Sequence, residues 1–116
     1  MYKPLPNCLT IKESKIHGLG LFAAKDIPPN IDLGITHVPD ERFEDGYIRT
    51  PLGGFFNHSK KPNCTVVDKE NCLRLITSVE IKTDTENIVD KIRINEKELI
   101  NISIEKLRQQ MTLRLN

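Results

Sequence analysis

Two clusters in the first half of the chain combine side chains and spacings that could serve chemistry. The first covers residues 14–27 and contains a His-Gly-Leu-Gly run at residues 17–20. Glycine is the usual residue of tight turns, and at a strand edge it also lets the backbone come close to a flat ligand. A helix-forming run does not follow these glycines, so the context of a dinucleotide-binding fingerprint is missing. Taken alone, this cluster predicts a bend between two strands.

The second cluster covers residues 53–64 and reads Gly-Gly-Phe-Phe-Asn-His-Ser-Lys-Lys-Pro-Asn-Cys. It is dense in groups that hydrogen-bond locally, so Asn57 and Ser59 could cap a turn while the two phenylalanines join the core. A catalytic triad built on His58 and Ser59 is not supported, because adjacent side chains point apart and no Gly-x-Ser-x-Gly elbow surrounds the serine. The cluster is therefore a candidate for binding rather than for nucleophilic catalysis.

The composition is that of one small globular domain. A chain of 116 residues, with 38% hydrophobic and 28% charged residues, fits a single core. Seventeen Lys and Arg residues against sixteen Asp and Glu residues give a net charge of +1. Because this balance does not hold a protein on DNA or on a membrane surface by net charge, we expect neither as a direct partner.

The sequence also predicts a cytoplasmic protein without a metal site. No apolar run approaches the roughly 18 residues of a membrane span, and the first ten residues lack the apolar core of a signal peptide. The three cysteines, Cys8, Cys64 and Cys72, cannot all pair, which suits a reducing compartment. They form no Cys-x-x-Cys pair, and the three histidines are scattered, so we expect no bound metal.

The elements that must position these clusters are predicted to be short and mostly β. Glycine and proline punctuate the first half of the chain, so strands there must be brief. Residues 31–56 are the least periodic, which predicts a loop with at most one short strand or helical turn. The other expected elements are strands at 9–11 and 21–24, a turn at 26–30, a hairpin of 65–67 and 73–77 around 68–71, and a terminal helix capped near Ser103.

Taken in order and about 40 residues apart, the two clusters resemble the SET-domain family of protein lysine methyltransferases. The first is similar to the pattern Ser-x-Ile-His-Gly-x-Gly-x-Phe-Ala followed by Asp-Ile, and the second to Asn-His-Ser-x-x-Pro-Asn. Lys60 stands where that family often has a cysteine, as in the short viral SET proteins, which also match in length. The resemblance covers about residues 9–100 of a single domain spanning 1–116.

This resemblance implies a fold of several small curved sheets with a pseudoknot and a short C-terminal helix. It also implies a pocket for S-adenosylmethionine beside the pseudoknot, and a narrow channel through which a lysine of a protein substrate enters from the opposite face. The two glycines would bring the backbone against the cofactor, the asparagine and histidine would hold its amino-acid and adenine ends, and an aromatic ring would line the pocket. By that resemblance the cofactor residues are Gly18, Leu19, Gly20, Leu21, Phe56, Asn57 and His58.

The late part of the chain departs from the family pattern. The family carries a catalytic tyrosine after a Gly-Glu-Glu-Leu-like turn, and two registers are open for it. Residues 84–87 as the turn put Lys91 at the tyrosine position, whereas residues 96–99 put Ser103 there. The turn glycine is absent from both registers. Tyr47, in the unmatched middle of the chain, is the candidate that could reach the channel instead.

Two functions follow as expectations. The first is S-adenosylmethionine-dependent methyl transfer to a protein lysine, supported by the intact Asn-His-Ser run. The second is a module that keeps the fold to bind cofactor or a protein segment without methyl transfer, supported by the missing tyrosine. A chain with several short strand edges could also form a homodimer, although the sequence does not show one.

Overall fold

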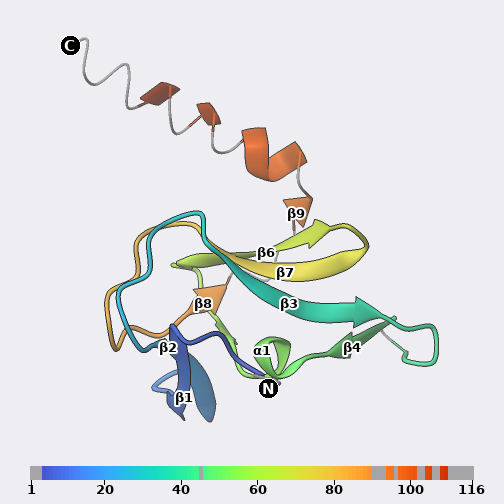
Figure 1. The fold of residues 1–116 in the computed structure, drawn as a ribbon, viewed down its shortest axis with the longest axis horizontal. Helices are drawn as coiled ribbons and strands as arrows, with labels where there is room; N and C mark the ends of the chain where they lie inside the picture. The colour runs from blue at the N-terminus through green and yellow to red at the C-terminus, as the bar shows by residue number, and fades with distance from the viewer. Residues whose placement is uncertain are drawn as a thin grey trace.

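A small hairpin and a larger mixed sheet form the framework of the protein (Figure 1). The computed structural model describes residues 4–44, 46–89, 94–95, 97–101, 104–105 and 108–109. The larger sheet has the strand order β4-β3-β7-β6-β8-β5, and β9 also pairs with β6. The elements are β1 (Leu9–Glu13), β2 (Leu19–Ala23), β3 (Asp32–Pro39), β4 (Tyr47–Arg49), α1 (Pro51–Gly54), β5 (Asn57–His58), β6 (Cys64–Lys69), β7 (Cys72–Thr77), β8 (Ile88–Val89) and β9 (Ile94–Asn95). This arrangement confirms the prediction of a mostly β protein with many short strands.

The hairpin of β1 and β2 carries the first sequence cluster. Its strands are antiparallel, with Leu9 opposite Ala23 and Glu13 opposite Leu19. Both strands were predicted, but β1 extends to Glu13 and β2 already begins at Leu19. The bend therefore lies just before Leu19, where the Ser14 amide donates to the Gly18 carbonyl oxygen at 2.8 Å.

The second hairpin, β6 and β7, follows the predicted pattern closely. Its turn residues Glu70 and Asn71 have φ values of 52° and 66°. Two consecutive residues with positive φ are typical of a type I′ turn, whose twist matches that of the flanking strands. The strands supply much of the core, and the largest fully buried aliphatic side chains of the described residues are Leu21, Ile27, Leu73, Leu75, Ile81, Val67 and Val89.

The prediction of a loop over most of residues 31–56 is wrong. The segment contains β3, an eight-residue strand that pairs with β4 on one side and β7 on the other. Its pairing with β7 shifts register twice, once between Asp32 and Gly34 and once between Ile35 and His37. Each shift interrupts the alternation of buried and exposed residues, so the sequence shows no period of two.

The helix α1 is seated on the second of these bulges. Thr50 caps it, because the Gly53 amide donates to the Thr50 Oγ1 at 3.3 Å, and the Thr50 amide donates to the Thr36 carbonyl oxygen at 2.9 Å. A Cβ atom at Gly53 would overlap that same carbonyl oxygen. Only glycine therefore lets the helix lie this close to β3.

We expect Gly53→Ala to lower the free energy of unfolding by about 2–4 kcal/mol, because a rigid backbone carbonyl must move to admit the new methyl group. The matched control is Gly54→Ala in the same helix, where an added Cβ meets no atom within 4 Å. That control should change the stability by about 1 kcal/mol or less, in the stabilising direction. Urea denaturation of both variants measures the difference, and equal effects would contradict the close packing of α1 on Thr36.

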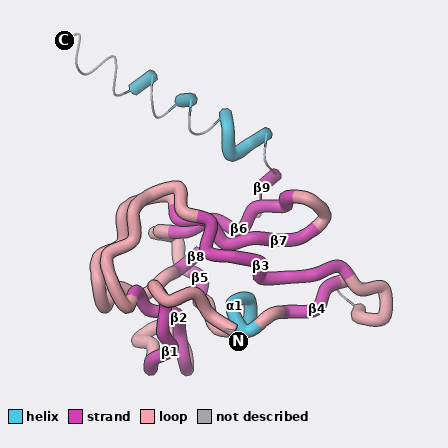
Figure 2. The backbone as a smooth tube through the Cα atoms, viewed as in Figure 1, coloured by secondary structure: helices cyan, strands magenta, loops and turns pink. Residues whose placement is uncertain are grey.

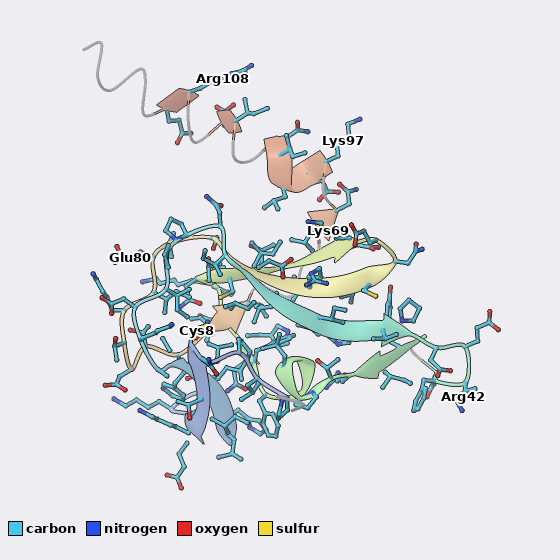
Figure 3. All side chains as sticks on the ribbon, viewed as in Figure 1. Cys8, Arg42, Lys69, Glu80, Lys97 and Arg108 are labelled. Atoms are coloured by element: carbon cyan, nitrogen blue, oxygen red, sulfur yellow. The ribbon has the colours of Figure 1, made fainter. Side chains whose placement is uncertain are left out.

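Two loops complete the body. Figure 2 shows the loop after β2 running beside the loop after β7, and Ile27 and Ile81 exchange backbone hydrogen bonds of 2.8 Å between them. The β3–β4 hairpin projects at the other side, with Arg42 at its tip (Figure 3). No helix among the described residues is long and apolar enough to cross a membrane.

The C-terminal helix begins earlier than predicted. Residues 97–101 are helical, and the Glu98 amide donates to the Asn95 Oδ1 at 2.9 Å. Asn95 therefore caps the helix that begins at residue 97, whereas the predicted cap near Ser103 lies outside the described residues. Asparagine is as good a cap as serine, and its three-residue spacing from Glu98 is the usual one.

Candidate cofactor site

The side chain of Asn57 joins the two sequence clusters. Its Nδ2 donates to the carbonyl oxygens of His17 at 3.1 Å and Leu19 at 3.3 Å, and to the Glu86 Oε2 at 2.8 Å. Asn57 lies in β5, and the two carbonyl groups lie at the turn and the start of β2. Residues 40 apart in the sequence are thus held within one hydrogen-bond network.

Glu86 and Ser14 complete this network. The Ser14 Oγ lies 2.8 Å from both carboxylate oxygens of Glu86, so its single hydrogen is donated to this carboxylate, and it accepts from the Ile16 amide at 2.9 Å. Ser14 therefore shapes the turn that leads to the glycines while it binds the same carboxylate as Asn57. The sequence did not single out Ser14 or Glu86, although both lie in segments matched to the family pattern. Glu86 could not be identified because the choice between the two registers was open.

Glycine is required at residues 18 and 20 for different structural reasons. Gly18 has φ +50°, a left-handed conformation that favours glycine, and a Cβ there would meet no atom within 4 Å. Gly20 is buried, and a Cβ there would overlap the Glu86 carboxylate and come within 3.2 Å of the Asn57 Nδ2. The absence of a side chain at Gly20 thus leaves room for the hydrogen bond between Glu86 and Asn57, while the backbone at Gly18 borders open space.

The leucines between and after these glycines differ in exposure. Leu19 is 49% exposed beside the open turn, whereas Leu21 is fully buried in the core. Leu21 can therefore approach a ligand only through its backbone, and its carbonyl oxygen already accepts from the Asn87 amide at 2.8 Å.

The segment from Asp84 to Val89 threads between β2 and the second cluster. On one side the Asp84 amide donates to the Ala23 carbonyl oxygen at 2.7 Å. On the other side β8 pairs in parallel with β5, and the Ser59 amide donates to the Val89 carbonyl oxygen at 3.0 Å. A late segment held between two earlier ones is the pseudoknot that the resemblance implied.

The conformation of Asp84 decides between the two late registers. Asp84 has φ +68°, and it occupies the position where the first register expects the turn glycine. Residues 97–99 of the second register are helical and form no such turn. The structure therefore favours residues 84–87 as the turn, which puts the tyrosine position at Lys91, outside the described residues.

A row of aromatic rings leads from the second cluster to Tyr47. The ring of His58 lies 5.6 Å from that of Phe56, edge to face, and Phe56 lies 6.4 Å from His37. His37 in turn lies 5.9 Å from Tyr47 at an interplanar angle of 80°. Only the ring of His37 therefore lies between Tyr47 and Phe56, which is a predicted cofactor residue. Sequence reasoning missed His37, because a single histidine in an aperiodic stretch carries no signal of its own.

The buried thiol of Cys64 is not a nucleophile. Burial raises its pKa to about 12, so the thiol stays protonated at neutral pH. Its Sγ lies 3.6 Å from the Nδ2 of Asn87, a fully buried residue at the leucine position of the matched turn. Both side chains belong to the packing beneath the site.

The residues present fit the amino-acid and adenine ends of S-adenosylmethionine. The carbonyl oxygens of His17 and Leu19 and the carboxylate of Glu86 already accept from the Asn57 Nδ2, and the further lone pairs of these oxygens suit a positively charged ammonium group beside them. Aromatic surface lies nearby, because the exposed His58 belongs to β5 together with Asn57 and the ring of Phe56 comes directly before this strand. Acceptors for a cation beside aromatic surface are what that ligand requires.

Comparison with known proteins places the fold. A scan against protein-family models finds no match, and no curated protein matches the sequence. A Plasmodium falciparum protein described as a candidate histone methyltransferase matches with a TM-score of 0.60 and 21% identity over 75% of this chain and 95% of that chain. The methyltransferase domain of human PR domain-containing protein 2 matches with a TM-score of 0.61 and 15% identity, over 73% and 77%. A humanized Polycomb Repressive Complex 2 from Chaetomium thermophilum matches with a TM-score of 0.55 and 18% identity, over 71% of this chain and 14% of that one.

These similarities, together with the threaded segment and the small curved sheets, show that the chain has the SET-domain fold.

Proposed function

We propose that this protein binds S-adenosylmethionine and transfers its methyl group to the side-chain amine of a lysine in another protein. The observation that carries the proposal is the Asn57 side chain, which joins the His-Gly-Leu-Gly turn to Glu86 on a SET-domain fold. Similar solved structures described as methyltransferases support the reaction class. Those described as acting in histone methylation support a lysine-bearing protein segment as the substrate.

In this proposal the chain's own residues bind and orient rather than react. Asn57, His58 and the backbone at Gly18 and Gly20 hold the cofactor, with Phe56 beside them. When bound, the cofactor supplies an electrophilic methyl group. The lysine nitrogen forms the new N–C bond, the sulfur keeps the electron pair of the broken S–C bond, and the amine loses a proton to water.

The substrate amine must first be neutral. Its usual pKa of about 10.4 makes deprotonation at pH 7 cost about 4.6 kcal/mol. A channel that desolvates the ammonium and fixes its lone pair offsets this cost. Tyr47 is the phenol that we assign to this task, since the aromatic row connects it to Phe56.

The second candidate function is a module that binds cofactor or a protein segment without methyl transfer. The φ of +68° at Asp84 favours it, because this register puts a lysine where the family has its catalytic tyrosine. A module that still binds the cofactor shares the cofactor site with the enzyme and differs from it in turnover.

The cellular setting belongs to the same proposal. Lys60, which follows the Asn-His-Ser run, supports a relationship to the short viral-type SET proteins, acting in the cytoplasm of the host cell. A homodimer is proposed from the short strand edges.

The test is a methyl-transfer assay with a labelled donor on histones and on bulk bacterial protein. The enzyme proposal predicts labelled methyl-lysine in the acid hydrolysate of at least one substrate. Binding of the donor without labelled lysine in any substrate would refute the enzyme and establish the binding module.

A further inference from the structure

We propose that His37 is a positioning residue, which holds the rings of Tyr47 and Phe56 where the substrate amine approaches. The inference deepens the proposed function and rests on it. It starts from the backbone of β3, which departs from regular pairing where this histidine enters the core.

A β-bulge turns the His37 side chain inward. Ile35 lies opposite Arg74 and His37 opposite Leu73, so two steps along β3 match one step along β7. Thr36 and His37 are consecutive and yet both buried, with exposed fractions of 0% and 3%. In a regular strand one of the two would face away, so the bulge re-aims a side chain, as bulges beside functional sites often do.

The hydrogen bonds of Thr36 fix the tautomer of the histidine ring. The Thr36 hydroxyl donates its single hydrogen to the Leu73 carbonyl oxygen at 3.1 Å. The His37 Nδ1 lies 2.8 Å from the same Oγ1, and while the Thr36 hydroxyl donates to Leu73 this oxygen accepts from an Nδ1–H group. In the neutral ring the Nε2 is then an acceptor, and the ring plane is set by the bond to Thr36.

The bulge is itself held from the other side. Thr50 donates from its amide to the Thr36 carbonyl oxygen, and Gly53 packs so close that an added Cβ there would overlap that oxygen. The cap and helix α1 thus serve a purpose beyond local structure, because they immobilise the peptide that carries Thr36. Thr50 and Gly53 of the run at residues 50–54 are explained by this contact.

The ring so fixed lies between two side chains of the site. Tyr47 lies opposite Pro39 and is therefore the diagonal neighbour of His37 on the paired strand, at a centroid distance of 5.9 Å. Phe56 packs against the same ring at 6.4 Å and against His58 at 5.6 Å. A core that needed only volume here would be served by leucine, whereas an imidazole must satisfy its nitrogens. We therefore assign the ring to the orientation of Tyr47 and Phe56.

Three variants test separately the ring of His37, its nitrogens and the hydroxyl group of Thr36. His37→Phe keeps a ring and removes both nitrogens, His37→Asn keeps an amide donor for Thr36 and removes the ring, and Thr36→Val removes the acceptor that fixes the tautomer. Val38→Ala is the matched control, since Val38 is the next residue of β3 and is exposed. Initial rates with a labelled donor give kcat and KM for the protein substrate, and titration gives Kd for S-adenosylmethionine, all below the melting temperature of each variant.

We expect His37→Phe, His37→Asn and Thr36→Val each to lower kcat by about 10- to 100-fold, with the cofactor Kd changed by less than about threefold. The number of methyl groups per lysine should also change, because the two rings set the room around the amine. The control should match the parent protein. Folded variants with parental kcat and parental methylation number would overturn the inference.

A spectroscopic readout keeps the inference testable apart from activity. The chain has no tryptophan and two tyrosines, so the near-UV circular dichroism of a Tyr2→Phe background reports on Tyr47 alone. His37→Asn should change this signal and Val38→Ala should not. If the parent protein binds cofactor without transferring methyl groups, the enzyme proposal fails, and an unchanged Tyr47 signal would then overturn the positioning role as well.

Discussion

Asn57→Ala is expected to weaken the binding of S-adenosylmethionine by about 10- to 100-fold. The substitution removes the one donor that holds the His17 and Leu19 carbonyl groups and the Glu86 carboxylate together. A hydrogen bond to a charged group contributes about 1.5–3 kcal/mol, and the freed turn loses its position as well. The rise in melting temperature at a fixed cofactor concentration measures the effect, because only the folded state binds the ligand.

Asn63→Ala is the matched control for this prediction. Its Nδ2 donates to the Glu86 carbonyl oxygen at 2.8 Å, and its Oδ1 accepts from the Ile88 amide at 2.8 Å. Asn63 thus supports the same threaded segment, and in the described part of the chain it makes no hydrogen bond to the His-Gly-Leu-Gly turn. We expect a loss of about 1–3 kcal/mol in stability and a cofactor affinity within about threefold of the parent. Equal losses of affinity in the two variants would contradict the assignment of Asn57.

Tyr47→Phe is expected to reduce turnover by about 10²- to 10⁴-fold, with little change in cofactor affinity. This is the usual loss when a positioned acid–base group is removed from a site that otherwise remains intact. Tyr2→Phe, the same change at the only other tyrosine of the sequence, is the control and should leave turnover unchanged. Brisk methylation by Tyr47→Phe would show that the amine is oriented by a different group.

Restoring a tyrosine late in the chain tests the register independently. Because Asp84 has the positive φ of the turn, Lys91→Tyr should raise turnover and Ser103→Tyr should not. The comparison needs only the relative rates of the two variants with one substrate. A gain in Ser103→Tyr alone would contradict the register that Asp84 indicates.

The parts of the fold with local signals could be predicted from the sequence. The β6–β7 hairpin has turn-forming residues between two apolar runs, and the β1–β2 hairpin has a glycine turn between two more. The strand β3 could not be found in this way. Its bulges at Leu33 and Thr36 remove the period of two, and its stability comes from pairing with strands far away in the sequence.

The residues of the candidate site likewise divide into those with a local sequence signal and those without one. Gly18, Gly20 and Asn57 stand in contiguous runs that resemble a family pattern, so they could be named from the sequence. Glu86 meets Asn57 across 29 residues, and its role needed the choice of a register that only the conformation of Asp84 supplies. His37 has no motif around it; its place between two rings follows from a bulge, which no sequence periodicity encodes.

Calorimetric titration of the purified protein with S-adenosylmethionine tests the central claim most directly. We predict one binding site per chain, saturable at or below millimolar cofactor, with the demethylated product competing for the same site. The Kd from the titration should rise by about 10- to 100-fold in Asn57→Ala and stay within about threefold of the parent in Asn63→Ala. The absence of both binding heat and thermal stabilisation at millimolar cofactor would contradict the cofactor site and leave only the fold.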